Sequence, residues 1–362
     1  MQYVSNGWKF STFKMNKTYL SHPTCSFLDV NLERTKGAFI ASVLTIIGNA
    51  VFSLITATGN FIILEVIWKA QELHSPSFIL LFCLAVSDFL VGLICQPSFV
   101  AYQIAELAES FSVYCTLRMI QNISSWTTSG VSLLILSAVS IDRFLALTLH
   151  LRYNTVITVP RMIQTAVCLW IFAVAVATLK FWMSKWIIIP ALILVLAFLV
   201  TTLSTLKIFQ IVRRHQRQIS QQQESVQSNT INMLKCKKSA VTVLYVYGLF
   251  VIFYLPFCIT MFVETFTGYT LTVKIVYDYV GTVVYINSFL NPVVYCWRIG
   301  EVRRAVKNRL RNWKWFWDYN FRYVLVSECV WVQYEWYLNI FQILLKFRLN
   351  DKLVASQVIT IK

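Results

Sequence analysis

The sequence predicts an all-α integral membrane protein, a bundle of seven transmembrane helices followed by one short amphipathic helix. Hydrophobic residues make up 57% of the 362-residue chain and charged residues only 13%, about half the charged share of an ordinary soluble domain. Apolar runs of about 20 residues recur along the chain, long enough to cross a hydrocarbon core as helices. Short polar gaps separate them, which favours one bundle. The seven runs lie at 37–67, 76–101, 115–146, 161–180, 186–211, 239–263 and 272–297.

Basic residues decide the predicted orientation. The formal net charge is +16, and the cations crowd the gap between the fifth and sixth runs and the stretch after the seventh. The positive-inside rule assigns both regions to the cytoplasm, so the N-terminus is expected outside the cell. Because these cations flank spans instead of forming a soluble basic domain, we expect a lipid bilayer and no nucleic acid as partner.

The chain after the seventh run has helical periodicity with two unlike faces. Ile299, Val302, Val306 and Leu310 recur at three- and four-residue spacing, and cations fill the other face. This pattern predicts an amphipathic helix lying in the cytoplasmic interface. We therefore expect three regions: an extracellular segment over 1–36, a membrane domain over 37–312, and an aromatic-rich cytoplasmic tail over 313–362. The tail is either an extra interfacial helix or a gene-model artefact, and we assign it no function.

Polar residues placed one per run carry the most specific signal. Asp142-Arg143-Phe144 closes the third run and Asn291-Pro292-Val293-Val294-Tyr295 closes the seventh. A charge in hydrocarbon costs roughly 2.5–3.5 kcal/mol on insertion scales, so each is expected to have a use. Together with Asn60, Asp88, Trp170 and Pro256, these residues resemble the rhodopsin-like (class A) family of G-protein-coupled receptors. The resemblance covers residues 37–312, leaves the subfamily unassigned, and includes a loose likeness to melanocortin and adenosine receptors.

The resemblance implies a conformational switch. In the family the arginine at Arg143 contacts the G protein when the sixth helix moves outward, and the prolines at 256 and 292 kink their helices. Tyr254 stands where the family usually has Trp. A plain anchor at the membrane edge is the alternative for Asp142 and Arg143. The switch residues are Asp142, Arg143, Phe144, Phe250, Tyr254, Pro256, Asn291, Pro292 and Tyr295.

An allosteric sodium ion is also implied, and no other cofactor. The family holds this ion on the second-helix aspartate, here Asp88, with oxygen donors from the third and seventh helices. Oxygen ligands suit a hard cation. A satisfied polar network without an ion is the alternative. The matching positions are Asp88, Ser132, Asn287, Ser288 and Asn291.

The expected ligand enters from outside the cell. No Asp or Glu occurs between Phe111 and Ile141, whereas relatives that bind biogenic amines use an aspartate on the third helix. An amine is therefore disfavoured, and a peptide, lipid or nucleoside is expected. The candidate pocket residues are Ser125, Thr128, Ser129, Tyr254, Phe257, Met261 and Tyr285. Each of them is equally plausible as a residue that only packs one helix against another.

The extracellular side departs from the family pattern. The family ties the third helix to the second outer loop by a disulfide, but that loop, at about 180–185, has no cysteine. Cys115 is the third-helix candidate and Cys25 is the other cysteine expected outside, so the two either form a bridge or remain free thiols. Asn16-Lys17-Thr18 is a glycosylation sequon on the same side. The N-terminal residues show no apolar core of a cleavable signal peptide.

The favoured function is a plasma-membrane receptor that activates a heterotrimeric G protein and catalyses no reaction. An enzyme is disfavoured because the four His lie outside the runs or at their edges, without a metal or triad pattern. A transporter would show internal repeats or several embedded charges, and neither is seen. A non-signalling decoy or dimer partner stays open because the fifth run lacks the expected tyrosine, with Phe198 or Thr205 in its place.

Overall fold

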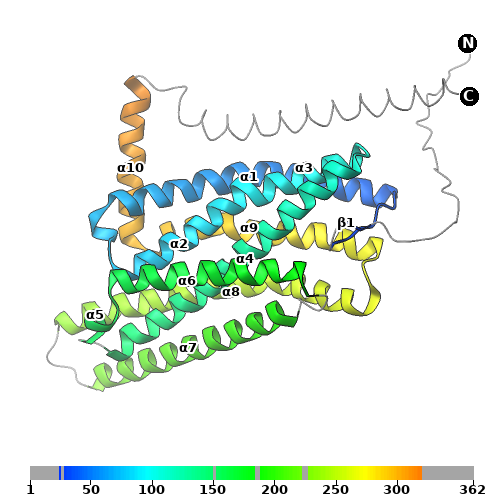
Figure 1. The fold of residues 1–362 in the computed structure, drawn as a ribbon. Coiled ribbons are helices and arrows are strands. Elements are labelled where there is room, and N and C mark those ends of the chain that lie inside the picture. The colour runs from blue at the N-terminus through cyan, green and yellow to red at the C-terminus, as the bar shows by residue number, and fades with distance from the viewer. Residues whose placement is uncertain (1–23, 26–27, 150–151, 184–187, 222–226, 320–362) are drawn as a thin grey trace, which may run out of the picture.

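The fold is a bundle of long helices lying side by side, with one helix turned across its end (Figure 1). It is seen in a computed structural model that describes residues 24–25, 28–149, 152–183, 188–221 and 227–319. Side chains are described for these residues except 212, 215–246 and 312–319. The sequon at Asn16 and residues 320–362 of the predicted tail lie outside the described residues.

The elements follow one another along the chain with short connections. Two-residue strands β1 and β2 pair antiparallel as a small hairpin before the first helix. The bounds are β1 Thr24–Cys25, β2 Leu28–Asp29, α1 Lys36–Lys69, the 3₁₀ turn η1 Gln71–Leu73, α2 Pro76–Leu90, the π-helix η2 Val91–Cys95, α3 Gln96–Leu107, α4 Phe111–Leu149, α5 Tyr153–Val156, α6 Val159–Thr178, the 3₁₀ turn η4 Leu179–Phe181, α7 Ile188–Gln221, α8 Gln227–Thr267, α9 Leu271–Arg298 and α10 Gly300–Tyr319.

Six of the described helical segments are long and apolar enough to cross a membrane, and they match the first six predicted runs. The seventh, α9, is 28 residues long, sufficient for a span. It is less apolar because it carries Lys274, Asp278, Asn287 and Asn291, all of them buried within the bundle. Its polar groups therefore face the protein, which is where intramembrane polar residues are tolerated.

Several predicted boundaries were wrong. The second span was expected at 76–101 as one helix but runs to Leu107 and contains a π-helical turn, η2. Gly92 lies in that turn, where an added Cβ would sit 2.6 Å from the backbone nitrogen of Ala57. The bulge thus brings the second span into close contact with α1, an approach that glycine permits.

Two other helices are longer than their apolar parts. α8 begins at Gln227, twelve residues before the predicted sixth run, since no Gly or Pro interrupts the polar stretch ahead of it. α10 continues past the expected end at 312 to Tyr319. It is the amphipathic helix predicted from the sequence: Val302 is fully buried, while Arg303, Arg304 and Lys307 are exposed. Figure 1 shows α10 running across the direction of the other helices.

The helix α4 lies at the centre of the bundle, in contact with α2, α3, α6, α7 and α8, and α9 packs against α1 and α8. The hairpin β1–β2 lies at the end where α1 and α9 begin and α3 ends (Figure 1). We call this the hairpin end and the opposite end, which carries α10, the α10 end. The single helix α4 therefore contributes side chains to the hairpin end, to the core and to the α10 end.

Candidate functional site

The last turns of α4 hold a buried charge pair at the α10 end. Asp142 is 3% exposed, and its Oδ2 lies 3.2 Å from Nη2 of Arg143. The Arg143 side chain is 26% exposed, so its long stem lies on protein while the head reaches the surface. Attraction between the two charges is stronger here than between fully solvated groups.

Asp142 is also held by two neighbouring hydroxyls. Ser77 Oγ, at the start of α2, donates to Asp142 Oδ2 at 2.9 Å, and the Tyr153 hydroxyl on α5 donates to Oδ1 at 2.6 Å. Burial and the hydrogen bond to Asp142 raise the pKa of Tyr153 to about 12. Its hydroxyl therefore stays a donor throughout the physiological pH range. Sequence analysis did not predict either contact, because neither hydroxyl lies near Asp142 in a helical register.

A second group of polar residues lies in the middle of the bundle. Asp88 is fully buried, and Asn291 Nδ2 donates to its Oδ2 at 2.7 Å. Its other oxygen, Oδ1, is buried without a hydrogen-bond partner among the described residues. Ser132 contacts Ser87 instead, with 3.0 Å between the hydroxyl oxygens.

A small cavity adjoins this group. Its volume is about 10 Å³, measured as the space open to the centre of a water-sized sphere, roughly what one water molecule needs. Three of the five predicted sodium ligands, Ser132, Asn287 and Asn291, therefore line the cavity. Asp88 does not line it but is hydrogen-bonded to Asn291. The lining residues are Leu84, Ser132, Leu136, Phe250, Asn287 and Asn291.

The residues present fit a monovalent cation. They provide carboxylate, amide and hydroxyl oxygens beside a space for one water-sized body, and the unpaired Oδ1 of Asp88 is an unused acceptor. The backbone of Ser288 has a further role, since its carbonyl accepts a hydrogen bond from Asn60 Nδ2 at 3.1 Å. Pro292 has no N–H to bond the carbonyl four residues earlier, and the amide of Asn60 fills that place.

Phe250 of α8 lines the cavity and belongs to a group of aromatic residues from α7 and α8. Phe250 and Tyr254 are stacked with ring centroids 3.9 Å apart, and Phe198 of α7 lies 5.9 Å from Phe250. Pro256 lies inside α8 two residues beyond Tyr254, so the helix lacks one backbone hydrogen bond there. The two predicted switch residues Phe250 and Tyr254 are therefore in direct contact.

Tyr295 does not reach Arg143 in this structure. It is 1% exposed and packs among apolar residues of α1, α2 and α4. Its hydroxyl is buried without a hydrogen-bond partner among the described residues. A buried unpaired hydroxyl costs free energy, so this side chain would gain by moving to a place with a partner.

The half of the bundle nearer the hairpin end holds a neutral polar group. The Tyr285 hydroxyl lies 2.6 Å from Ser125 Oγ, and Gln121 Nε2 donates to the same hydroxyl at 2.6 Å. Ser125 and Tyr285 were predicted to line the pocket, and the structure brings them together. Gln121 was not predicted, although it lies four residues before Ser125 on the same helix face.

The remaining predicted pocket residues lie in different surroundings from one another. Thr128 is buried and donates to the Ser124 carbonyl of its own helix at 2.9 Å, so packing accounts for it. Phe257 stacks edge-on with Trp126 of α4 at a centroid distance of 6.0 Å. Ser129 and Met261 are partly buried on α4 and α8.

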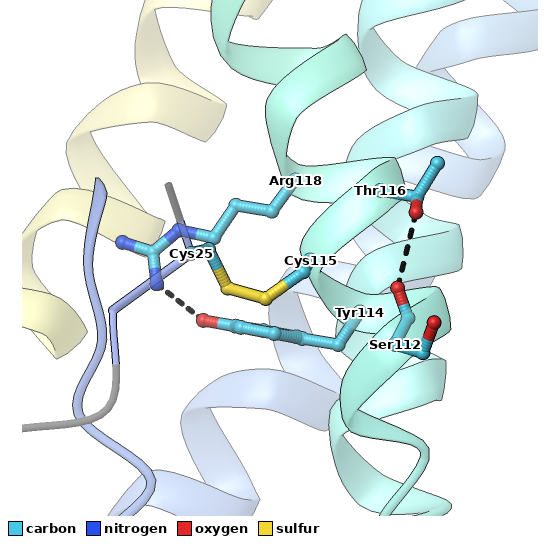
Figure 2. Close-up of a disulfide and its surroundings, with 6 residues drawn as sticks. All are labelled: Cys25, Ser112, Tyr114, Cys115, Thr116 and Arg118. Carbon is cyan, nitrogen blue, oxygen red and sulfur yellow. Dashed lines mark hydrogen bonds between the residues drawn. A yellow bond between two sulfur atoms is a disulfide. The ribbon is translucent and has the colours of Figure 1, made fainter. Parts of the chain in front are cut away.

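The N-terminal segment is fastened across the hairpin end. A disulfide joins Cys25 to Cys115, as the first of the two alternatives expected (Figure 2). Lys274 Nζ donates to the Asn31 carbonyl at 2.9 Å and also pairs with Glu106 of α3. Leu28 and Val30 are each 5% exposed and belong to the same apolar cluster as Tyr285.

The sequence matches a known protein family over more than half of its length. A family model described as "7 transmembrane receptor (rhodopsin family)" matches residues 59–189 and 186–295. Among curated proteins, the chain is similar to trace amine-associated receptor 8b of Rattus norvegicus, with 24% identity over 290 residues, 70% of this chain and 82% of the relative. Trace amine-associated receptor 8c of the same organism matches with the same identity and coverage.

Proposed function

The chain belongs to the rhodopsin family of seven-transmembrane receptors, and we propose from this that it binds an extracellular ligand and activates a heterotrimeric G protein. Membership makes it a multi-pass plasma-membrane receptor and not an enzyme. Signalling would depend on the α10 end of the bundle, and ligand binding on the hairpin end.

The observation that carries the proposal is the bonding of Asp142 at the α10 end. Its carboxylate accepts from Ser77 and Tyr153 while it pairs with Arg143. Because Arg143 and Asp142 are adjacent in the helix, the Arg143 side chain can rotate away from Asp142 without unfolding of the helix. In the proposed active state α8 moves outward at the α10 end, and Arg143 turns from Asp142 towards the G protein. Pro256 makes α8 a bent lever for this movement.

Two features support an extracellular hairpin end. A disulfide persists in an oxidising compartment, and Cys25–Cys115 lies at that end. The exposed cations of α10 lie at the other end, as the positive-inside rule expects for the cytoplasmic side. Both observations favour an N-terminus outside the cell and Arg143 at the cytoplasmic face.

The proposed ligand is not a biogenic amine, even though the curated relatives are named trace amine-associated receptors. Ser125, Gln121 and Tyr285 form a neutral hydrogen-bonded group in the expected pocket. An ammonium group there would find no carboxylate on α4, which has none between Phe111 and Ile141. A buried ammonium without a counter-ion is costly, so the proposed class is a peptide, a lipid or a nucleoside.

We also propose that sodium binds beside Asp88 and favours the inactive state. The proposed donors are Asp88, Ser132, Asn287, Ser288 and Asn291, and three of them, Ser132, Asn287 and Asn291, line the small cavity. An ion there would give Asp88 Oδ1 the partner it lacks. Movement of α8 and α9 during activation would change the cavity, whose walls include Phe250 and Asn291.

One observation favours a second function, a non-signalling decoy or dimer partner. Thr205 lies buried on α7, and its hydroxyl has no hydrogen-bond partner among the described residues. The family usually has a tyrosine in this part of the helix. A threonine there is too short to supply the same contact to Tyr295 or Arg143 after activation.

The test is second-messenger output, cyclic AMP and calcium, in cells expressing the chain or its Arg143→Ala variant. Peptides, lipids, nucleosides and amines would be applied, with equal surface expression confirmed. A response of the parent chain that is lost in Arg143→Ala supports receptor signalling through this residue. Silence across every class would favour the decoy.

A further inference from the structure

Arg118 is a half-buried cation at the hairpin end that the proposed signalling mechanism does not use. It lies on α4, three residues beyond Cys115, so it points into the space beneath the N-terminal segment (Figure 2). We propose that Arg118 binds an anionic group of the extracellular ligand, an oxyanion such as a carboxylate. This inference rests on the proposed receptor function and names the ligand chemistry that the pocket selects.

Two neutral side chains hold the Arg118 guanidinium in place. Its Nη1 donates to the Tyr114 hydroxyl, and its Nη2 donates to the Tyr269 hydroxyl at 2.8 Å. Both rings also lie under the cation, with the carbon of the guanidinium 5.5 Å and 5.1 Å from their centroids. Burial raises the pKa of Tyr269 well above its ordinary value, so this partner remains an uncharged phenol.

No carboxylate lies within ion-pair distance of Arg118 among the residues that the structure describes. By contrast, the buried cation Lys274 at the same end forms an ion pair with Glu106. Asp278 is nearby but forms no ion pair with Arg118, and it accepts a hydrogen bond from Tyr102 at 3.4 Å. A cation partly removed from water without a paired charge is costly, so the site would gain from an added anion.

The guanidinium has donors left for such an anion. Arginine carries five N–H groups in a planar fork, and the two phenols occupy two of them. The fork matches the two oxygens of a carboxylate or phosphate, and such charge-assisted pairs are among the strongest hydrogen bonds in proteins. The phenols fix the orientation of the fork before a ligand arrives, which lowers the entropy lost on binding.

The side chains that follow Arg118 towards the core suit a ligand with an anionic head and an uncharged body. Gln121 and Ser125 follow Arg118 at three and seven positions along α4, so the three share a face. The two lower residues bond Tyr285 and carry no charge. Trp126 and Phe257 add aromatic surface at the same depth. A head bound at Arg118 would thus extend its body down towards Tyr285.

The fastened N-terminal segment strengthens the interaction. Cys25, in disulfide with Cys115, lies beside the guanidinium (Figure 2). Leu28 and Val30 are buried next to it. Apolar cover reduces the local dielectric, so an ion pair formed beneath it is stronger than at an open surface. The alternative role for Arg118 is purely structural: it would link Tyr114 to Tyr269 and bind no ligand. The experiment below distinguishes this role from ligand binding.

The experiment measures binding of three matched probes to the purified full chain in lipid nanodiscs. The probes share a phenylpropyl skeleton and differ in head group: 3-phenylpropionate is anionic, 3-phenylpropionamide is neutral and 3-phenylpropylamine is cationic. Thermal unfolding across a concentration series reports binding. It needs no G protein, so failure of signalling and failure of this proposal are separate outcomes. The variants are Arg118→Gln and Arg118→Lys, and Lys36→Gln changes an exposed cation at the same end as a control.

We expect the carboxylate to bind the parent chain at least about tenfold tighter than the amide, because it adds a charge-assisted bond, and the amine to bind more weakly than both. The preference should vanish in Arg118→Gln, fall in Arg118→Lys, which keeps the charge without the fork, and persist in Lys36→Gln. Unfolding without probe shows whether each variant is folded. The proposal is overturned by an equal preference in Arg118→Gln, by tighter binding of the amine, or by stabilisation of the parent chain by none of the probes.

Discussion

Tyr153 shows how a single hydroxyl can link the short helix α5 to the charge pair of α4. Its hydrogen bond to Asp142 and that of Ser77 use acceptor sites of a carboxylate that also pairs with Arg143. Such sharing stabilises the arrangement of all three groups. It also means that loss of one donor changes how firmly Asp142 holds its orientation.

Replacement of Tyr153 by Phe removes this donor and keeps the ring. We expect basal second-messenger output to rise about twofold to tenfold, because a hydrogen bond to a charged group stabilises the inactive arrangement. The pKa of Tyr153 is raised to about 12, so its donor is complete below the ordinary tyrosine pKa and is lost only as pH rises through that raised value. The increase should therefore be independent of pH in the physiological range.

The matched control is Tyr279→Phe, since Tyr279 is 40% exposed on α9. Equal surface expression of both variants would be measured by antibody labelling of intact cells. Basal output that is unchanged in Tyr153→Phe would contradict a restraining role for this hydrogen bond.

Helix register is the residue-level information that the sequence carries best. Ser125 and Tyr285 are both predicted pocket residues, and their hydroxyls lie 2.6 Å apart in the structure. Ser77 and Tyr153 were missed because both lie in or next to connections, where no period relates them to Asp142. Gln121 and Arg118 share a face with Ser125, so the same register could have indicated them.

Among the elements, the π-helical turn η2 fits the second span against α1. Gly92 allows this contact, because an added Cβ would overlap the Ala57 backbone. We expect Gly92→Ala to destabilise the protein by about 1–3 kcal/mol, as overpacking does in tight cores. Thermal unfolding of the purified chain in detergent measures the effect.

Gly281→Ala is the control for that change. Gly281 lies in α9, and a Cβ there would meet nothing within 4 Å. Alanine is the better helix former, so this variant should be as stable as the parent chain or slightly more stable. A Gly92→Ala protein that unfolds at the parent temperature would show that α1 and η2 do not pack as described.

The hairpin β1–β2 depends on the disulfide to the start of α4. Cys25 and Cys115 are 90 residues apart in sequence, so their bridge closes a long loop, and removal should cost about 2–4 kcal/mol. We expect Cys25→Ser and Cys115→Ser to lower the unfolding temperature equally, and the double variant to lower it no further. Cys168, an exposed free thiol, supplies the control Cys168→Ser.

Additive losses in the double variant would contradict the bridge, because two independent thiols would then be responsible.

The pairing was one of two open alternatives in the sequence, since distance between Cα atoms cannot be derived from spacing. The two short strands were not predicted at all. Two residues per strand are too few for an alternating pattern to appear.

For the whole molecule, the proposed sodium ion would link the middle of the bundle to the state of its ends. An ion that binds the inactive bundle should stabilise it in proportion to its concentration. We expect the purified chain to unfold at a higher temperature in sodium chloride than in N-methylglucamine chloride of the same ionic strength. The difference should be lost in Asp88→Asn and kept in Asp278→Asn, which changes another buried carboxylate. A sodium effect of equal size in Asp88→Asn would exclude this site.

The architecture was largely predictable because the bilayer imposes span length and internal hydrogen bonding. Apolar runs located all seven helices, and the amphipathic pattern located α10. The least apolar span, α9, was also located as an apolar run at 272–297, and Asn291-Pro292 and Tyr295 near its end carry the family resemblance. Polar continuations such as the start of α8 were missed, because hydropathy marks where a helix leaves the membrane and not where it ends.

The most direct test of receptor function is nucleotide exchange on purified heterotrimeric G proteins by the chain in lipid nanodiscs. Asp142→Asn removes the charge that pairs with Arg143, and adding Arg143→Ala removes the group proposed to contact the G protein. We expect Asp142→Asn to raise ligand-independent exchange above the parent chain on at least one G-protein class, and Arg143→Ala to abolish that increase. Exchange equal to that of empty nanodiscs for every variant and every class, or an increase that survives Arg143→Ala, would contradict the proposed mechanism.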